Sequence, residues 1–229
     1  MDAKWIEHES RAGVIHAGDR SAWGHWMPGN VLDAGWALPQ EMDGSERVVA
    51  WSGTVAEGMF EADPRTWGPR GQEGLKARCD GLMHELVERG ITLAMRPHAR
   101  HVLGDAHRCA LFLAWREGQP FELVLDPASL LTAGMLEKSE DHLIRIFEIL
   151  GGRPGVCGVV LANVRAPSDE AGEPGGGPDA GPPLELCSLH GAGGVLDAGL
   201  IERLCVEHVP AGVPVFRVGD GGAGGVEAR

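Results

Sequence analysis

The chain has 229 residues, a formal net charge of −13 and 43% hydrophobic residues. This length allows one domain with a sizeable core, but a complete eight-unit βα barrel typically needs ~250 residues. The negative charge argues against a nucleic-acid partner, because a protein that follows the phosphate backbone needs a basic face. No apolar run approaches the roughly 18 residues of a membrane span, so we expect no membrane partner.

The five cysteines are widely scattered, and none forms a CxxC pair. An odd number of cysteines without metal-ligand spacing predicts reduced, mostly buried thiols in a cytoplasmic protein. The amino terminus also lacks the apolar core of a signal peptide. The five residues are Cys79, Cys109, Cys157, Cys187 and Cys205.

The first 45 residues are rich in Trp, Gly and Pro and show weak periodicity, with one short strand expected at 12–15. A clearer strand is expected at 47–51. An amphipathic helix is then expected from Leu75 to Val87, because its apolar residues recur with a 3.6-residue period. Gly90 is expected to end that helix in the left-handed conformation.

Three more helix–strand units follow with the same pattern. The expected helices cover 105–115, 139–150 and 197–208, and the expected strands begin at 121, 156 and 213. The segment 166–183 contains many Gly and Pro and no large apolar group, so it is expected to be a flexible loop. The Gly-rich tail at 219–229 is expected to be frayed. The chain as a whole is expected to form a single α/β barrel-like domain over 1–229.

Four of the apolar runs end in a polar residue, namely Arg96, Asp126, Asn163 and Arg217. Short apolar runs separated by helices are typical of parallel strands that are buried on both faces. In such sheets the functional groups sit at the carboxyl ends of the strands. We therefore expect these four side chains to share one rim.

Five segments carry a family resemblance: 91–98 (ITLAMRPH), 123–129 (LVLDPAS), 157–165 (CGVVLANVR), 191–201 (GAGGVLDAGLI) and 213–218 (VPVFRV). Through them the stretch 48–218 resembles the xylose-isomerase-like TIM barrels, a superfamily that includes sugar phosphate isomerases and epimerases and DNA-repair enzymes of the endonuclease IV type. The residues before 48 are too few for the first three βα units of that family. The resemblance therefore implies a TIM-barrel-like fold that is incomplete or irregular at its N-terminal end, which a homo-oligomer or another partner could complete.

The resemblance also implies a divalent metal (Mn, Mg, Co or Zn), which the family holds with two Glu, one Asp and one His. Only Asp126 is retained here, because Arg96 stands at the first Glu position and Arg217 or Val218 at the last. Val160 stands at the His position. A guanidinium stays protonated and cannot ligate a cation. We therefore expect no cofactor, unless a rearranged and active site holds a divalent metal.

Two interpretations of the Arg96 and Asp126 pair stay open. They could form a purely structural ion pair, or Arg96 could bind a carboxylate or phosphate while Asp126 orients it. His98 and His101 lie just beyond the strand that ends at Arg96, with i, i+3 spacing. They are either a catalytic acid/base pair or solvated loop residues.

Three further residues, Asn163, Arg217 and His190, are candidates for ligand binding. His190 is included because it precedes a Gly-rich turn ahead of a helix, where backbone N–H groups could meet a phosphate. The tryptophans of the first quarter suit either a carbohydrate platform or packing inside an incomplete barrel.

Two functions follow from these residues. The preferred one is a divergent sugar phosphate isomerase/epimerase-like protein with a degraded metal site, which binds a small carbohydrate or anionic ligand without metal catalysis, as a pseudoenzyme would. The alternative is an active sugar isomerase or epimerase that uses Asp126 with His98 or His101 for proton transfer.

Overall fold

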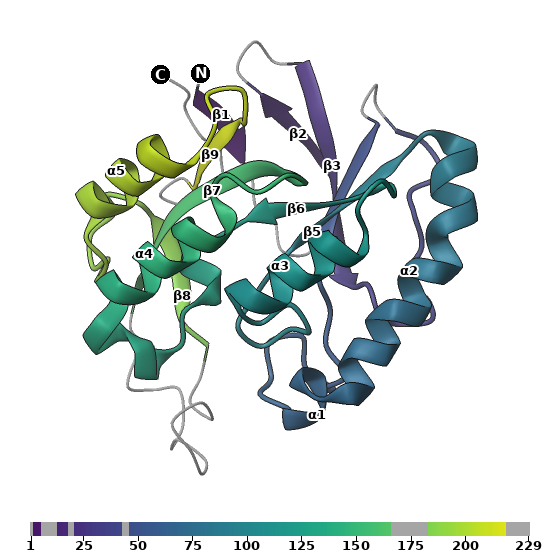
Figure 1. Ribbon diagram of the computed structural model, residues 1–229, viewed down its shortest axis with the longest axis horizontal. Helices are drawn as coiled ribbons and strands as arrows, with labels where there is room; N and C mark the ends of the chain where they lie inside the picture. The colour runs from purple at the N-terminus through teal and green to yellow at the C-terminus, as the bar shows by residue number, and fades with distance from the viewer. Residues whose placement is uncertain (1, 6–12, 18–20, 43–45, 166–182, 219–229) are drawn as a thin grey trace.

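The computed structural model describes residues 2–5, 13–17, 21–42, 46–165 and 183–218. The predicted flexible loop, apart from Pro183, and the predicted frayed tail lie outside these residues. Figure 1 shows an α/β molecule in which one curled sheet carries its helices along one side. None of the helices in the described part of the chain has the length and apolar character needed to cross a bilayer.

The elements follow one another in two groups, strands first and then alternating helices and strands. The strands are β1 (Asp2–Trp5), β2 (Gly13–Ala17), β3 (Ser21–Asn30), β4 (Arg47–Trp51), β5 (Thr92–Arg96), β6 (Phe121–Leu125), β7 (Val156–Arg165), β8 (Glu185–Ser188) and β9 (Val215–Val218). The helices are α1 (Pro64–Trp67), α2 (Pro69–Arg89), α3 (Ala106–Trp115), α4 (Ser139–Leu150) and α5 (Ala198–His208), with two 3₁₀ turns at Ala128–Leu130 and Ala133–Lys138.

The sheet combines a parallel part with an antiparallel part. Strands β3 to β7 pair in parallel in chain order, and β7 then pairs in parallel with β9. At the other end β1, β2 and β3 pair antiparallel, while β1 pairs in parallel with β9. The sheet therefore curls round on itself. Within the described residues, helices connect β4 to β5, β5 to β6, β6 to β7 and β8 to β9, which amounts to half of a βα barrel. This confirms the predicted α/β barrel-like fold with an irregular N-terminal part.

Two apolar cores lie on the two faces of this sheet. The outer core packs the strands against the helices, as the fully buried Leu93, Leu123 and Phe147 illustrate. The inner core fills the curl of the sheet with one or two side chains from each of β2 to β7 and β9. It consists of Ile15, Trp26, Val49, Trp51, Ala94, Val124, Val160 and Phe216.

The alternation of side chains along a strand decides which polar residues reach the interior. Successive side chains of a strand point to opposite faces, so a residue two positions from an inward one also points inward. Arg96 stands two residues after Ala94, and Asp126 two residues after Val124. Both side chains are therefore directed into the curl at the carboxyl ends of their strands.

The helix boundaries follow local signals that the sequence already contains. Helix α2 ends at Gly90, whose φ of 64° lies in the left-handed region as predicted. Asp105 caps α3 by accepting from the backbone N–H of Arg108, and Asp197 caps α5 in the same way. Four of the five cysteines are buried, Cys157 is partly buried, and all are free thiols.

Candidate functional site

The mouth of the curled sheet is sealed at its centre by a buried ion pair. Arg96 and Asp126 are both 0% exposed, and Arg96 donates from Nε and Nη2 to Asp126 Oδ2 at 2.9 and 2.7 Å. Ser129 adds a backbone N–H bond of 3.1 Å to Oδ1 and a hydroxyl bond of 2.6 Å to Oδ2. Oδ2 thus accepts three hydrogen bonds and Oδ1 one, so Arg96 and Ser129 engage both carboxylate oxygens of Asp126.

The guanidinium of Arg96 is also covered by aromatic rings. It lies 4.4 Å from the ring centroid of Trp51 and 5.9 Å from that of Trp26. Because a buried charge needs a partner and hydrogen bonds, this arrangement supports the structural interpretation of the pair. The alternative, in which Arg96 binds an anionic ligand, finds no support in the geometry.

His98 lies beside this pair and is held as a neutral imidazole. Its Nδ1 accepts from the backbone N–H of Arg100 at 3.0 Å, so the ring proton is assigned to Nε2. Burial lowers the pKa of His98 well below its ordinary value, and the charges of His101, Arg96 and Arg100 lower it further. No residue in the described ranges accepts from Nε2, and the ring borders a cavity.

His101 is fully buried and serves as a tether. Its Nε2–H donates to the backbone carbonyl of Met59 at 3.0 Å, while its Nδ1 has no hydrogen-bond partner among the described residues. Burial lowers the pKa of His101 to about 3, against the opposing effect of the Met59 bond. The predicted pair is thus brought together, with ring centroids 5.0 Å apart, but both rings are neutral at ordinary pH.

The tethered loop carries Phe60 over the mouth. The ring of Phe60 stacks on His101 at 5.5 Å with an interplanar angle of 17°, and it lies 4.8 Å from His98. Trp51 meets Phe60 edge-on at 5.4 Å. These rings form one wall of an aromatic cavity at the carboxyl ends of the strands.

That cavity has a volume of about 390 Å³ and is lined by Trp51, Phe60, His98 and the segment 183–186. This volume lies in the range of ~300–1,000 Å³ typical of small-molecule sites. Glu185, the first residue of β8, belongs to that segment. Sequence reasoning missed both Glu185 and Phe60, because neither belongs to a readable motif and only the pairing of β8 with β7 brings Glu185 to the mouth.

The other sequence candidates, Asn163, Arg217 and His190, do not reach the mouth, so the expected common rim is wrong for Asn163 and Arg217. Asn163 donates to the carbonyls of Leu189 and Leu196 and accepts from the N–H of Leu196, so it fixes the loop after β8. Arg217 and His190 instead meet at one carboxylate of α5, where Glu202 Oε1 lies 2.9 and 3.2 Å from them. Arg217 follows the inward Phe216 and therefore points outward.

A divalent metal of the family type does not fit these residues. The described part of the chain contains no group of three or more His, Cys, Asp and Glu side chains placed to hold a metal ion. Asp126, the one ligand position retained, is engaged by Arg96 and Ser129, and the guanidinium of Arg96 stands where a cation would have to bind.

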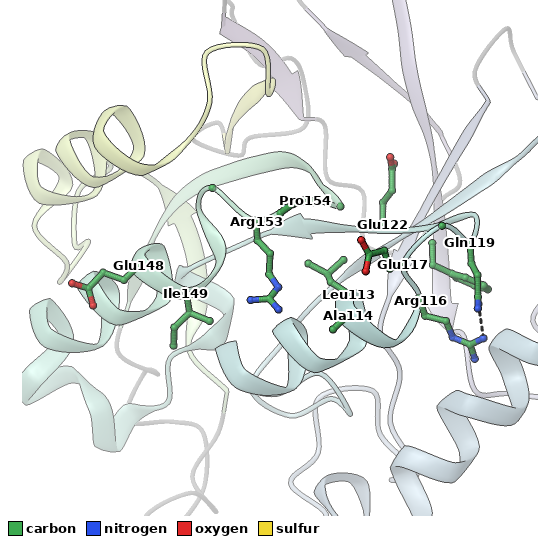
Figure 2. Close-up of a pocket in the computed structure, with 14 residues that line it drawn as sticks. Leu113, Ala114, Arg116, Glu117, Gln119, Glu122, Glu148, Ile149, Arg153 and Pro154 are labelled. Atoms are coloured by element: carbon green, nitrogen blue, oxygen red, sulfur yellow. Dashed lines mark hydrogen bonds between the residues drawn. The ribbon is translucent and has the colours of Figure 1, made fainter.

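A second cavity of about 710 Å³ lies at the opposite, amino-terminal end of the strands, between the ends of α3 and α4. Figure 2 shows Arg153 directed into this gap, whereas Arg116 points away toward Gln119, to which it donates at 2.9 Å. Glu117 and Glu148 also line it. In βα barrels this end serves stability, while function is built at the other end.

No family model matches the chain, and no curated protein does. Solved structures do match, all of them at low identity. A probable 3-DHS dehydratase, AsbF, involved in petrobactin synthesis in Bacillus anthracis, is 11% identical, with 79% of this chain and 58% of that chain covered and a TM-score of 0.48.

Two further matches are described by reference to xylose isomerase. A xylose isomerase-like TIM barrel protein from Mycobacterium smegmatis, in complex with magnesium, is 13% identical, covering 80% of this chain and 56% of that one with a TM-score of 0.46. A xylose isomerase domain protein from Planctomyces limnophilus is 16% identical, covering 76% and 52% with a TM-score of 0.45. The likeness concerns the fold alone, and this chain spans little more than half the length of those structures.

Proposed function

We propose that the mouth cavity binds a small carbohydrate or a related polyhydroxylated molecule, without a metal ion. The observation that carries this proposal is the composition of the 390 Å³ cavity. Two aromatic rings, Trp51 and Phe60, stand beside the imidazole N–H of His98. Aromatic faces pack against the C–H faces of sugars, and a few directed polar groups can bind hydroxyls.

The state of the polar groups favours a ligand with hydroxyls over one recognised by an arginine. The guanidinium of Arg96 is fully buried and bonded to Asp126, so it is closed to a ligand. His98 offers one hydrogen-bond donor without a charge, which suits a hydroxyl group.

Calorimetric titration with D-glucose and D-xylose tests the proposal. Phe60→Ala removes one aromatic face, and His98→Asn removes the Nε2 donor while its Oδ1 can still accept from the Arg100 N–H. Each is expected to weaken binding roughly tenfold, which corresponds to about 1.4 kcal/mol. The exposed Leu111→Ala is the matched control and should leave affinity unchanged.

Absence of binding of either sugar to the wild-type protein would overturn the proposal. Equal affinity in the wild type and in both cavity variants would also overturn it, because the sugar would then bind elsewhere.

A second candidate function is proton transfer on a carbonyl sugar. It is favoured by the neutral imidazole of His98 at the cavity, a group suited to general acid–base chemistry. Arg96 and Ser129 engage the oxygens of Asp126, so this function rests on His98. Exchange of the α-proton of D-fructose with D₂O, followed by proton NMR, tests this function, and His98→Asn should abolish any exchange.

A further inference from the structure

We propose that two copies of this chain form a symmetric dimer through the groove between α2 and α3. The groove has a volume of about 420 Å³ and lies among the helices on the outer side of the sheet. It shares no lining residue with the mouth cavity, so the interface does not depend on carbohydrate binding.

The groove is open because α2 and α3 do not pack closely against each other. Helix α3 packs on α4 and α4 packs on α5, whereas α2 and α3 approach each other much less closely. Arg116, which follows the last residue of α3, spans the two helices instead. It donates to the Asp80 carboxylate at 2.9 Å and to the Lys76 carbonyl at 3.2 Å. The space beside this bridge is not filled by the described residues.

The surface of the groove is apolar, and two large side chains project from its α3 side. Leu111 is 70% exposed and Trp115 is 42% exposed, and both line the groove. Exposed apolar groups that adjoin a concave apolar floor mark an interaction site, whereas scattered ones do not. The floor consists of four buried residues, Leu75, Val102, Leu103 and Phe112.

The shape of this surface is complementary to itself. A twofold interface uses the same patch on both copies, so the patch must hold both a projecting group and a hollow that receives it. Leu111 projects beside the hollow that it helps to line. A twofold axis close to Leu111 therefore places this side chain of each copy in the groove of the other.

The charges along the rim are self-complementary as well. Glu73 on α2 is exposed and has no hydrogen bond or ion pair within the described part of the chain. Arg108 on α3 is bonded to the Asp105 carboxylate and the Trp67 carbonyl, but its side chain is 34% exposed and keeps further N–H groups. The twofold axis brings Glu73 of each copy toward Arg108 of the other. A purely acidic partner would be repelled by Glu73 and a purely basic one by Arg108, which favours a second copy.

Sedimentation equilibrium of the wild-type chain between about 1 and 500 µM tests the proposal, since a groove of this size predicts a modest interface with a Kd of roughly 10–100 µM. Leu111→Glu puts a charge into the apolar groove and should weaken the dimer at least about 30-fold. Val206→Glu is the matched control. It makes the same kind of exchange at an apolar residue of α5 that is 85% exposed and does not line the groove, so the Kd should stay unchanged.

Two further variants test the geometry of the pair. Glu73→Lys should weaken the dimer about tenfold, because the new charge meets Arg108 of the other copy as a like charge. Leu111→Cys should form a disulfide between two copies under mild oxidation, because the two positions lie beside the twofold axis. Val206→Cys should form none.

A wild-type chain that stays monomeric over the whole range would refute the proposal and leave the groove to a different partner. A dimer that Leu111→Glu leaves intact would place the interface elsewhere and refute it as well. An unchanged Kd in Glu73→Lys, or no cross-link through Leu111→Cys, would overturn the twofold arrangement. Melting temperatures close to that of the wild type are expected because the substituted residues are exposed, and they would show that a lost dimer is not lost folding.

Discussion

Removing the buried carboxylate at the mouth should destabilise the protein far more than an ordinary substitution. In Asp126→Ala the guanidinium of Arg96 stays fully buried and loses both of its bonds to Oδ2. Ser129 loses the acceptors of its N–H and hydroxyl groups in the same step. The variant therefore leaves a desolvated charge without its carboxylate and two donors of Ser129 without their acceptors.

The magnitude follows from the burial of the pair. Breaking a buried ion pair by removing one partner costs about 3–5 kcal/mol, because the remaining charge is uncompensated. For a domain of this size each kcal/mol corresponds to roughly 2–4 °C, so the melting temperature should fall by roughly 6–20 °C. Replacing both residues, as Arg96→Met with Asp126→Leu, should recover most of this loss, since neither partner then leaves the other as an unpaired buried charge.

Thermal and urea unfolding followed by circular dichroism measure both variants and the single Arg96→Met variant in a double-mutant cycle. The exposed Glu207→Ala is the control and should shift stability by less than about 0.5 kcal/mol. A loss below about 1 kcal/mol in Asp126→Ala would refute the reasoning. So would a double variant no more stable than Asp126→Ala.

Three further predictions concern acid stability, the loop over the mouth and the loop after β8. Burial holds the pKa of His101 at about 3, below the ~6.5 of an unfolded histidine, so the unfolded state binds the proton first as the pH falls. The free energy of unfolding should therefore be highest above pH 6.5 and decline toward pH 3. In melting curves His101→Phe should flatten this decline, and an unchanged dependence on pH would contradict the assignment. Gly53 has a φ of 81°, and a Cβ there would lie 2.7 Å from Asn30 Oδ1, so Gly53→Ala should lower the melting temperature and weaken sugar binding. Gly90→Ala, at a φ of 64° in open space, should lower the free energy of unfolding by only about 1 kcal/mol. An equal loss of stability in the two variants would speak against the steric argument. The hydrogen bonds of the Asn163 side chain hold the loop after β8, so Asn163→Ala should speed amide exchange over 189–196. The same variant should leave the affinity for the sugar within about twofold of the wild type. A tenfold loss of sugar affinity would support the ligand-binding role that the sequence suggested.

The sequence predicted the helix-covered half of the fold well because its signals there are local. The apolar periodicity of α4 gave its bounds at 139–150, and Gly90 and Asp105 marked helix ends by their backbone preferences. The strand β3, by contrast, was not predicted. Its sequence SAWGHWMPGN mixes Trp, Gly and Pro and lacks the apolar alternation by which a strand is recognised.

The failure of the common rim has a geometric cause. Arg96 and Asp126 stand two residues from inward side chains, whereas Asn163 stands three residues after the inward Val160. A strand that is apolar on both faces does not show which of its residues face inward, so its phase cannot be read from the sequence. Glu185 escaped prediction for another reason, since only the pairing of β8 with β7 brings it to the mouth.

The central claim is that the ion pair of Arg96 and Asp126 stands in place of a metal at a mouth that binds carbohydrate. Calorimetric titration of D-glucose into protein treated with EDTA, and into the same protein with added MnCl₂, tests it most directly. We predict the same affinity in both titrations. Binding that appears only after manganese is added would contradict the account.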